Sequence, residues 1–157
     1  MLFFRFCRDK SSGKGKAQSM RIVTNNEKVR QELDGRWEVQ MVDGGYGDVL
    51  TAVRDLVHKG WRLLTHPLSG SVKPGQTPYK SVLVEQGDGV LDTDSLRILE
   101  DSLAAFRTQP RRMDKSREEW QRQLAEDFRE VDYQLLAGAL QSAAGPAGRL
   151  RVLVDRA

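Results

Sequence analysis

The residues best suited to chemistry gather in one polar segment between His66 and Ser81. Its sequence, His-Pro-Leu-Ser-Gly-Ser-Val-Lys-Pro-Gly-Gln-Thr-Pro-Tyr-Lys-Ser, places hydroxyl groups, two lysines and one imidazole on a stretch that contains three prolines. Proline fixes the φ angle, and a long connection without periodicity in a compact domain is usually functional or disordered. We therefore predict that residues 66–81 form a structured functional loop.

The run Ser69-Gly70-Ser71, followed by Lys73, has the chemistry that an anion requires. Glycine lets the backbone approach a ligand, successive N–H groups form a concave nest, and the lysine supplies a charge. The alternative is a Ser/Gly/Pro turn that bonds only to itself. The spacing does not match a phosphate-binding P-loop. The predicted ligand-binding residues are Asn25, Asn26, Thr65, His66, Ser69, Gly70, Ser71, Lys73, Thr77, Tyr79 and Lys80.

His66 is the one candidate for a catalytic role. It follows a predicted strand, so it could act as a general base, with Asp43 or Asp48 orienting it from neighbouring loops. The alternative is that His66 only ties the loop to the backbone. A serine nucleophile is not indicated, because the sequence has no G-x-S-x-G elbow. A Schiff-base lysine at 73 or 80 would require desolvation, which so polar a loop argues against.

Metal, cofactor, disulfide and membrane chemistry are not indicated. The two histidines have no carboxylate cluster at ligand spacing, and we expect no metal and no cofactor. Cys7 is the only cysteine, which fits a reducing compartment and predicts a cytoplasmic protein. No run approaches the roughly 20 apolar residues of a membrane span.

The basic charge belongs to one end of the chain. Residues 1–19 contain five basic residues and one acidic residue, a net +4 against +3 for the whole chain, so the remainder is about −1. We predict that residues 1–19 are a disordered basic extension, and Met20 is an alternative start. Nucleic-acid binding is not expected, because the charge does not lie on a folded face.

The apolar patterns place the elements that must position the loop. Strands are predicted at 21–24, 37–42, 61–65 and 81–85, and helices after Asn25 or Asn26, over 48–59 and after Asp92 or Thr93. An asparagine at 25 or 26 could equally bind a ligand. A long final helix has a stripe that is expected to be core, or else a surface for a partner: Trp120, Leu124, Phe128, Val131 and Leu135.

This order of elements predicts an α/β fold: a small three-layer sandwich with a mostly parallel four-stranded sheet and a long C-terminal helix. Its first three strands are expected to be parallel, and the direction of the fourth is open. One domain should span 20–143, with 144–157 as a tail or an edge strand. Ligands bind beyond the carboxyl ends of such strands, where Asn25, Asn26, the 43–45 turn and the 66–81 loop should meet.

Several motifs together resemble the GrdX family. They are Val-Thr-Asn-Asn26, Val-Arg-Asp-Leu-Val-His-Lys-Gly60, Leu-Leu-Thr-His-Pro-Leu-Ser-Gly-Ser-Val-Lys-Pro74 with Thr-Pro-Tyr-Lys-Ser81, and Glu126-Asp-Phe128 with Asp132. The resemblance covers about Met20 to Leu136. It implies a small bacterial protein associated with the glycine, sarcosine and betaine reductase system of amino-acid fermentation. It implies no assigned activity and no catalytic residues.

Two functions follow as hypotheses. The first is an accessory protein that binds a reductase component or a small anionic metabolite through the 66–81 loop. The second is an enzyme that acts on a small phosphorylated or carboxylated metabolite, with Lys73 and the Ser69-Gly70-Ser71 backbone holding the anion and His66 moving protons.

Overall fold

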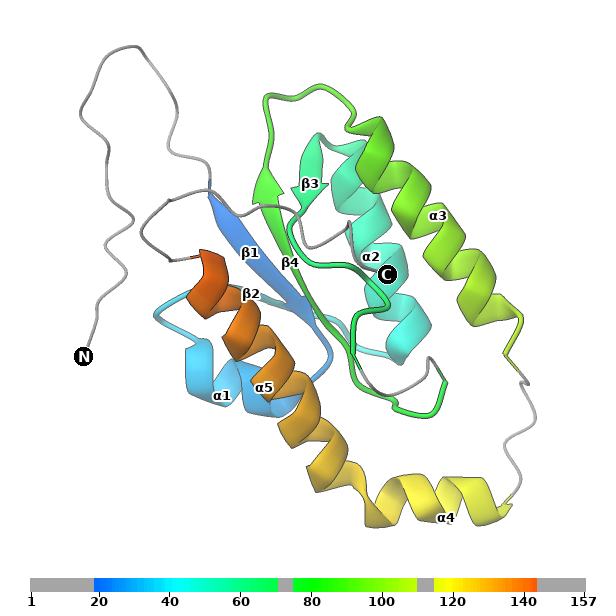
Figure 1. Ribbon diagram of the computed structural model, residues 1–157. Helices are drawn as coiled ribbons and strands as arrows, with labels where there is room; N and C mark the ends of the chain where they lie inside the picture. Colours follow the sequence, from blue (N-terminus) through cyan, green and yellow to red (C-terminus); the bar gives the residue numbers. More distant parts are fainter. Residues whose placement is uncertain (1–18, 71–74, 110–114, 144–157) are drawn as a thin grey trace.

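The protein is an α/β sandwich (Figure 1) in a computed structural model that describes residues 19–70, 75–109 and 115–143. The predicted segments 1–18 and 144–157 lie outside the described residues. The elements occur in the order β1 (Met20–Thr24), α1 (Glu27–Leu33), β2 (Glu38–Met41), α2 (Tyr46–His58), β3 (Trp61–Leu63), β4 (Ser81–Gln86), α3 (Thr93–Arg107), α4 (Lys115–Gln123) and α5 (Ala125–Ala143).

The sheet is mixed, so the prediction of a mostly parallel sheet was wrong. The strand order is β2-β1-β4-β3, and only β1 and β2 form a parallel pair. Strand β4 is antiparallel to both of its neighbours, β1 and β3. β1, β2 and β3 therefore point the same way, as expected, but β4 lies between β1 and β3.

The physical reason is the connection that precedes β4. Parallel neighbours require a crossover, usually a helix, whereas antiparallel neighbours can be joined by a loop. The residues between β3 and β4 have no helical pattern, so the chain returns as an antiparallel strand. Both ends of the 66–81 loop consequently lie at the edge where β1 ends, because Thr24 pairs with Ser81.

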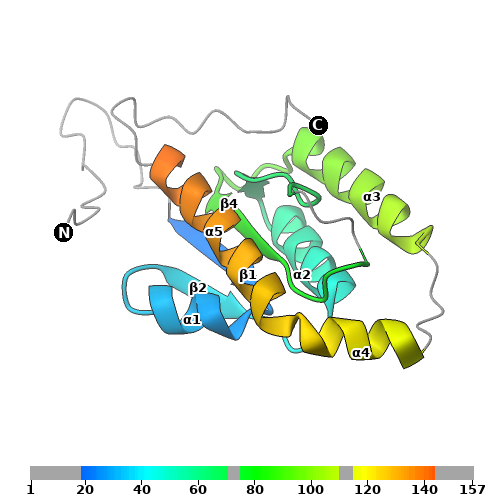
Figure 2. The same ribbon diagram turned by 60° about the horizontal axis from the view of Figure 1, so that its bottom comes forward.

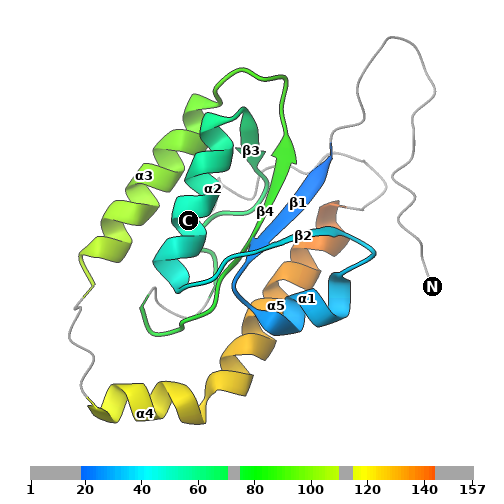
Figure 3. The same cartoon turned by 180° about the vertical axis from the view of Figure 1, so that it is seen from behind.

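Helices cover both faces of the sheet, which gives the three layers that were predicted (Figures 2 and 3). Alternate residues of β1 point to opposite faces. Val23 packs with residues of α2 and α3, and Ile22 packs with residues of α1 and α5. Strand β4 shows the same alternation, since Val82 and Val84 face α2 and Leu83 faces α5.

The C-terminal helical region differs from the single long helix that was predicted. Helix α4 ends at Gln123 and α5 begins at Ala125. The predicted stripe is only partly buried: Phe128 is in the core, but Trp120, Val131 and Leu135 are 43%, 37% and 44% exposed. The inward face of α5 instead consists of Phe128, Asp132, Leu136, Ala139, Leu140 and Ala143. The apolar stripe predicted the wrong face of α5 because the buried face contains an aspartate, Asp132, which an apolar pattern does not select.

Candidate functional site

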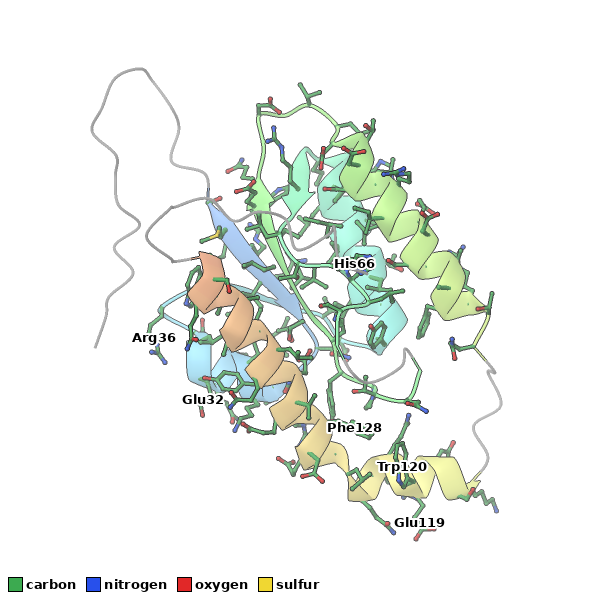
Figure 4. The ribbon with its side chains drawn as sticks, viewed as in Figure 1. Glu32, Arg36, His66, Glu119, Trp120 and Phe128 are labelled. Carbon is green, nitrogen blue, oxygen red and sulfur yellow. The ribbon has the colours of Figure 1, made fainter. Side chains whose placement is uncertain are left out.

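The 66–81 loop is held against helices on both of its sides. The Tyr46 hydroxyl at the start of α2 donates to the Pro67 carbonyl at 3.1 Å, and Leu68 packs on the cluster that contains Tyr46. On the other side, the Gln121 side chain of α4 donates to the Gln76 carbonyl at 2.9 Å. The described part of the loop is therefore anchored to α2 and α4. Figure 4 shows His66 on this connection and Phe128 on α5.

Asp132 is the centre of a buried hydrogen-bond network below the loop. Its side chain belongs to α5 and is 7% exposed. Its Oδ1 accepts from the Ser81 N–H at 2.9 Å, and its Oδ2 accepts from the Ser81 hydroxyl at 2.7 Å and from the Asn26 side-chain amide at 2.9 Å. Three donors from two separate segments of the chain thus bind one carboxylate, and these hydrogen bonds hold α5 against the end of the sheet.

The network extends from Ser81 into β1. Thr24 Oγ1 lies 2.6 Å from Ser81 Oγ and accepts from the Asn26 backbone N–H at 3.0 Å. Because the Ser81 hydroxyl donates to Asp132, the Thr24 hydroxyl must donate to Ser81. These polar groups are therefore mutually satisfied, as buried groups must be.

Lys80 is the buried cation of the site. Its residue is 5% exposed, and its Nζ donates to the Ser69 carbonyl at 2.8 Å and lies 6.0 Å from the centroid of the Tyr46 ring. Within the described ranges Lys80 forms no salt bridge. Burial lowers the pKa of Lys80 to about 8, against a smaller opposing effect of the Asp132 charge. The expectation that the loop is too polar to desolvate a lysine was wrong at this position.

A pocket lies between the loop and α5, and Lys80 lines it. Its volume is about 380 Å³, in the range of small-molecule sites. A second, smaller hollow also borders Lys80, Ser69 and Asp132. We call the larger space the Lys80 pocket; its walls include His66, Ser69, Lys80, Ser81, Asp132 and Leu135.

His66 lines the Lys80 pocket as a neutral imidazole. Its Nδ1 accepts from the Leu68 N–H at 3.1 Å, which places the proton of the neutral ring on Nε2. Burial, and then the Lys80 charge, lower the pKa of His66, so the ring is neutral at pH 7. Asp48, a predicted orienter, instead accepts from the Gly45 N–H. The structure thus favours the alternative in which His66 organises the loop. The Nε2–H of the neutral ring remains a hydrogen-bond donor.

The two asparagines after β1 are engaged by the protein. Asn25 donates to the carbonyls of Gly44 and Pro78 at 3.0 and 2.8 Å, and its Oδ1 accepts from the Lys80 N–H. Asn26 caps α1 by accepting from the Lys28 N–H. Asn25 therefore fixes the backbone that presents Lys80, and Asn26 links α1 to Asp132.

The other predicted ligand-binding residues divide into three groups. Ser69 and Gly70 border the hollows beside Lys80, together with Thr77 and Tyr79. Thr65 borders the Lys80 pocket, but its Oγ1 accepts from the Leu83 N–H at 3.0 Å. Ser71 and Lys73 lie outside the described residues.

Asp132 was not among the predicted site residues. A signal was present in the sequence, because Asp132 lies four residues after Phe128 and four before Leu136, within the apolar face of a helix. An acid on a buried helical face requires donors, and the sequence does not show where they are.

The described residues contain no cluster of His, Cys, Asp or Glu that could hold a metal ion. Among the helices that the structure describes, none has the length and apolar character needed to cross a membrane.

Comparison with known proteins identifies a family. No curated protein and no solved structure matched the chain. A family model for GrdX-like proteins matched residues 21–141, a stretch that includes Lys80 and Asp132 and covers most of the chain. The chain therefore belongs to the GrdX family.

Proposed function

We propose that this protein is an accessory protein of a glycine, sarcosine or betaine reductase system and binds a small anion in the Lys80 pocket. Membership of the GrdX family suggests the association with glycine reductase. The observation that carries anion binding is a buried ammonium group that borders a pocket and forms no salt bridge within the described residues.

The electrostatics of Lys80 explain why an anion would bind. An ammonium has three N–H donors, and among the described residues Lys80 uses one of them, in a hydrogen bond to the Ser69 carbonyl. A buried charge without a salt-bridge partner is costly, and a bound carboxylate or phosphate would supply both a close opposite charge and further acceptors. The proposal places Lys80 in the role that the sequence assigned to Lys73.

A thermal-shift experiment on the full chain tests this proposal. Glycine, sarcosine, betaine, acetate, phosphate and acetyl phosphate would be titrated separately. A ligand at about a hundred times its Kd adds roughly 2.7 kcal/mol to the free energy of unfolding, a shift of several degrees for a domain of this size. The affinity should fall as the pH rises through about 8, because only protonated Lys80 attracts the anion.

Two variants provide the controls. Lys80→Met should abolish the shift, and Lys80→Arg should retain part of it because the charge is kept. Lys59→Met, at an exposed lysine at the end of α2, should leave the shift unchanged. No shift with any of these anions, or a shift that survives Lys80→Met, would refute anion binding at this pocket.

A protein component of the reductase is a second candidate ligand. Trp120 of α4 and Val131 and Leu135 of α5 are large apolar side chains with more than a third of their surface exposed. Trp120 packs edge-on against Phe128 with ring centroids 5.3 Å apart (Figure 4). Val131 and Leu135 also border the smaller hollow, and exposed apolar residues that lie close together are typical of partner surfaces.

Co-elution with purified reductase components in size-exclusion chromatography tests this surface. Trp120→Ser should weaken a complex at least tenfold, because exposed tryptophans are common hot spots. Val90→Ser, at an apolar residue that is 67% exposed in the connection between β4 and α3, is the matched control. Equal binding by wild type and Trp120→Ser would exclude Trp120 from the interface.

A further inference from the structure

Lys80 has features of a lysine that reacts as a free amine. Its side chain is buried, forms no salt bridge with the described carboxylates, and borders a pocket. Desolvation favours the neutral amine over the ammonium, and the neutral amine has the lone pair that attacks a carbonyl carbon. Enzymes activate Schiff-base lysines by such burial.

The surroundings of Lys80 leave its amine in place for reaction. Within the part of the chain that the structure describes, Nζ donates to the Ser69 carbonyl, so this contact uses a proton of Lys80 and not its lone pair. The Asp132 oxygens accept from Ser81 and Asn26, and these donors compete with Lys80 for that carboxylate. The smaller hollow also has apolar walls from Phe128, Val131 and Leu135, which lower the local polarity.

We infer that Lys80 forms a reversible imine with a small 2-oxo acid. This inference rests on the proposed function, because the carboxylate of such a compound is the anion that the pocket would attract. A protonated imine keeps a positive charge at the position of Nζ, next to the carboxylate of the same molecule. One residue thus both attracts the anion and bonds to it.

The reaction is balanced without an oxidant or a metal. The Nζ lone pair forms a bond to the carbonyl carbon, the C=O π pair moves to oxygen, and a proton passes from nitrogen to that oxygen. The carbinolamine then takes up a second proton and loses water, and the nitrogen lone pair completes the C=N bond. The sum is amine plus carbonyl plus one proton giving protonated imine plus water. His66 lines the same pocket, and the Nε2–H of its neutral ring can donate a hydrogen bond to the carbinolamine oxygen.

Borohydride trapping of the full chain tests the inference. The protein would be incubated with pyruvate or glyoxylate and cyanoborohydride at pH 7.5, and the reduced adducts would be located by peptide mass spectrometry. We expect modification of Lys80 at least tenfold faster than that of exposed Lys59, because burial increases its free-amine fraction. Lys80→Arg should bind the anion but give no adduct at position 80.

The outcomes separate the two proposals. Adducts on Lys59 and other exposed lysines, with none on Lys80, would overturn the imine. If acetate still shifts the melting temperature in that case, the anion site stands alone. An adduct selective for Lys80, without any shift from acetate or phosphate, would support the imine and refute the anion proposal.

Discussion

Asp132→Ala is expected to lower the free energy of unfolding by about 3–5 kcal/mol. The change leaves the Ser81 N–H, the Ser81 hydroxyl and the Asn26 amide without their acceptor in a buried site. A buried donor that loses its partner costs about 1–3 kcal/mol, and more when the lost acceptor is charged. Chemical denaturation in urea would measure the loss as a lower midpoint at an unchanged slope.

Asp132→Asn and Asp127→Ala make this prediction specific. The asparagine keeps one acceptor but turns an NH₂ group toward donors. We therefore expect Asp132→Asn to lower the free energy of unfolding by about 2 kcal/mol or more. Asp127 is exposed in the first turn of the same helix, and its replacement should cost about 0.5 kcal/mol or less. If Asp132→Ala were as stable as Asp127→Ala, the network would not hold α5 on the sheet.

Lys80→Met is expected to stabilise the protein by about 2 kcal/mol at pH 7 while it abolishes anion binding. Methionine has a similar length and requires no solvation, so the cost of burying an ammonium disappears. One hydrogen bond to the Ser69 carbonyl is lost in exchange. A residue that lowers stability but borders a pocket is what a stability–function trade-off predicts.

The pH dependence of this difference provides a second measurement. Burial lowers the pKa of Lys80 to about 8 in the folded state, from an ordinary value of 10.5 in the unfolded chain. Between these pH values the unfolded chain holds a proton that the folded chain has lost, so wild-type stability rises with pH. Lys80→Met has no such dependence, and its advantage should shrink as the pH goes from 8 towards 10.

The groups that face Lys80 do not obscure this window. Burial raises the pKa of Tyr46 above its usual value, so its ring remains neutral. The pKa of His66 is lowered, so it is already neutral at pH 7. A stability difference between wild type and Lys80→Met that stays constant from pH 7 to 10 would show that Lys80 has an ordinary pKa.

The sequence by itself determined most of the strands and helices and the edge of the sheet at which the site residues meet. Val49, Val53 and Val57 recur at helical spacing, and the observed α2 buries all three. Turn and cap residues set the boundaries, as Asn26 and Asp92 show at the starts of α1 and α3. These signals are local, because backbone geometry relates residues that are close in the chain. The positions of Asn25 and the 66–81 loop after predicted strands likewise predicted that they lie at the same edge of the sheet.

Tertiary structure decided which residues of that edge are buried, paired or open. Ser81 and Asp132 are 51 residues apart in the chain, and their contact depends on how α5 docks on β4. The sequence pattern is compatible with either direction of β4, and its direction is set by pairing between β1 and β3. Lys80 acquires its pocket and its lowered pKa from Tyr46, Ser69 and α5 together. Desolvation depends on every neighbour in space, and the sequence orders only neighbours along the chain.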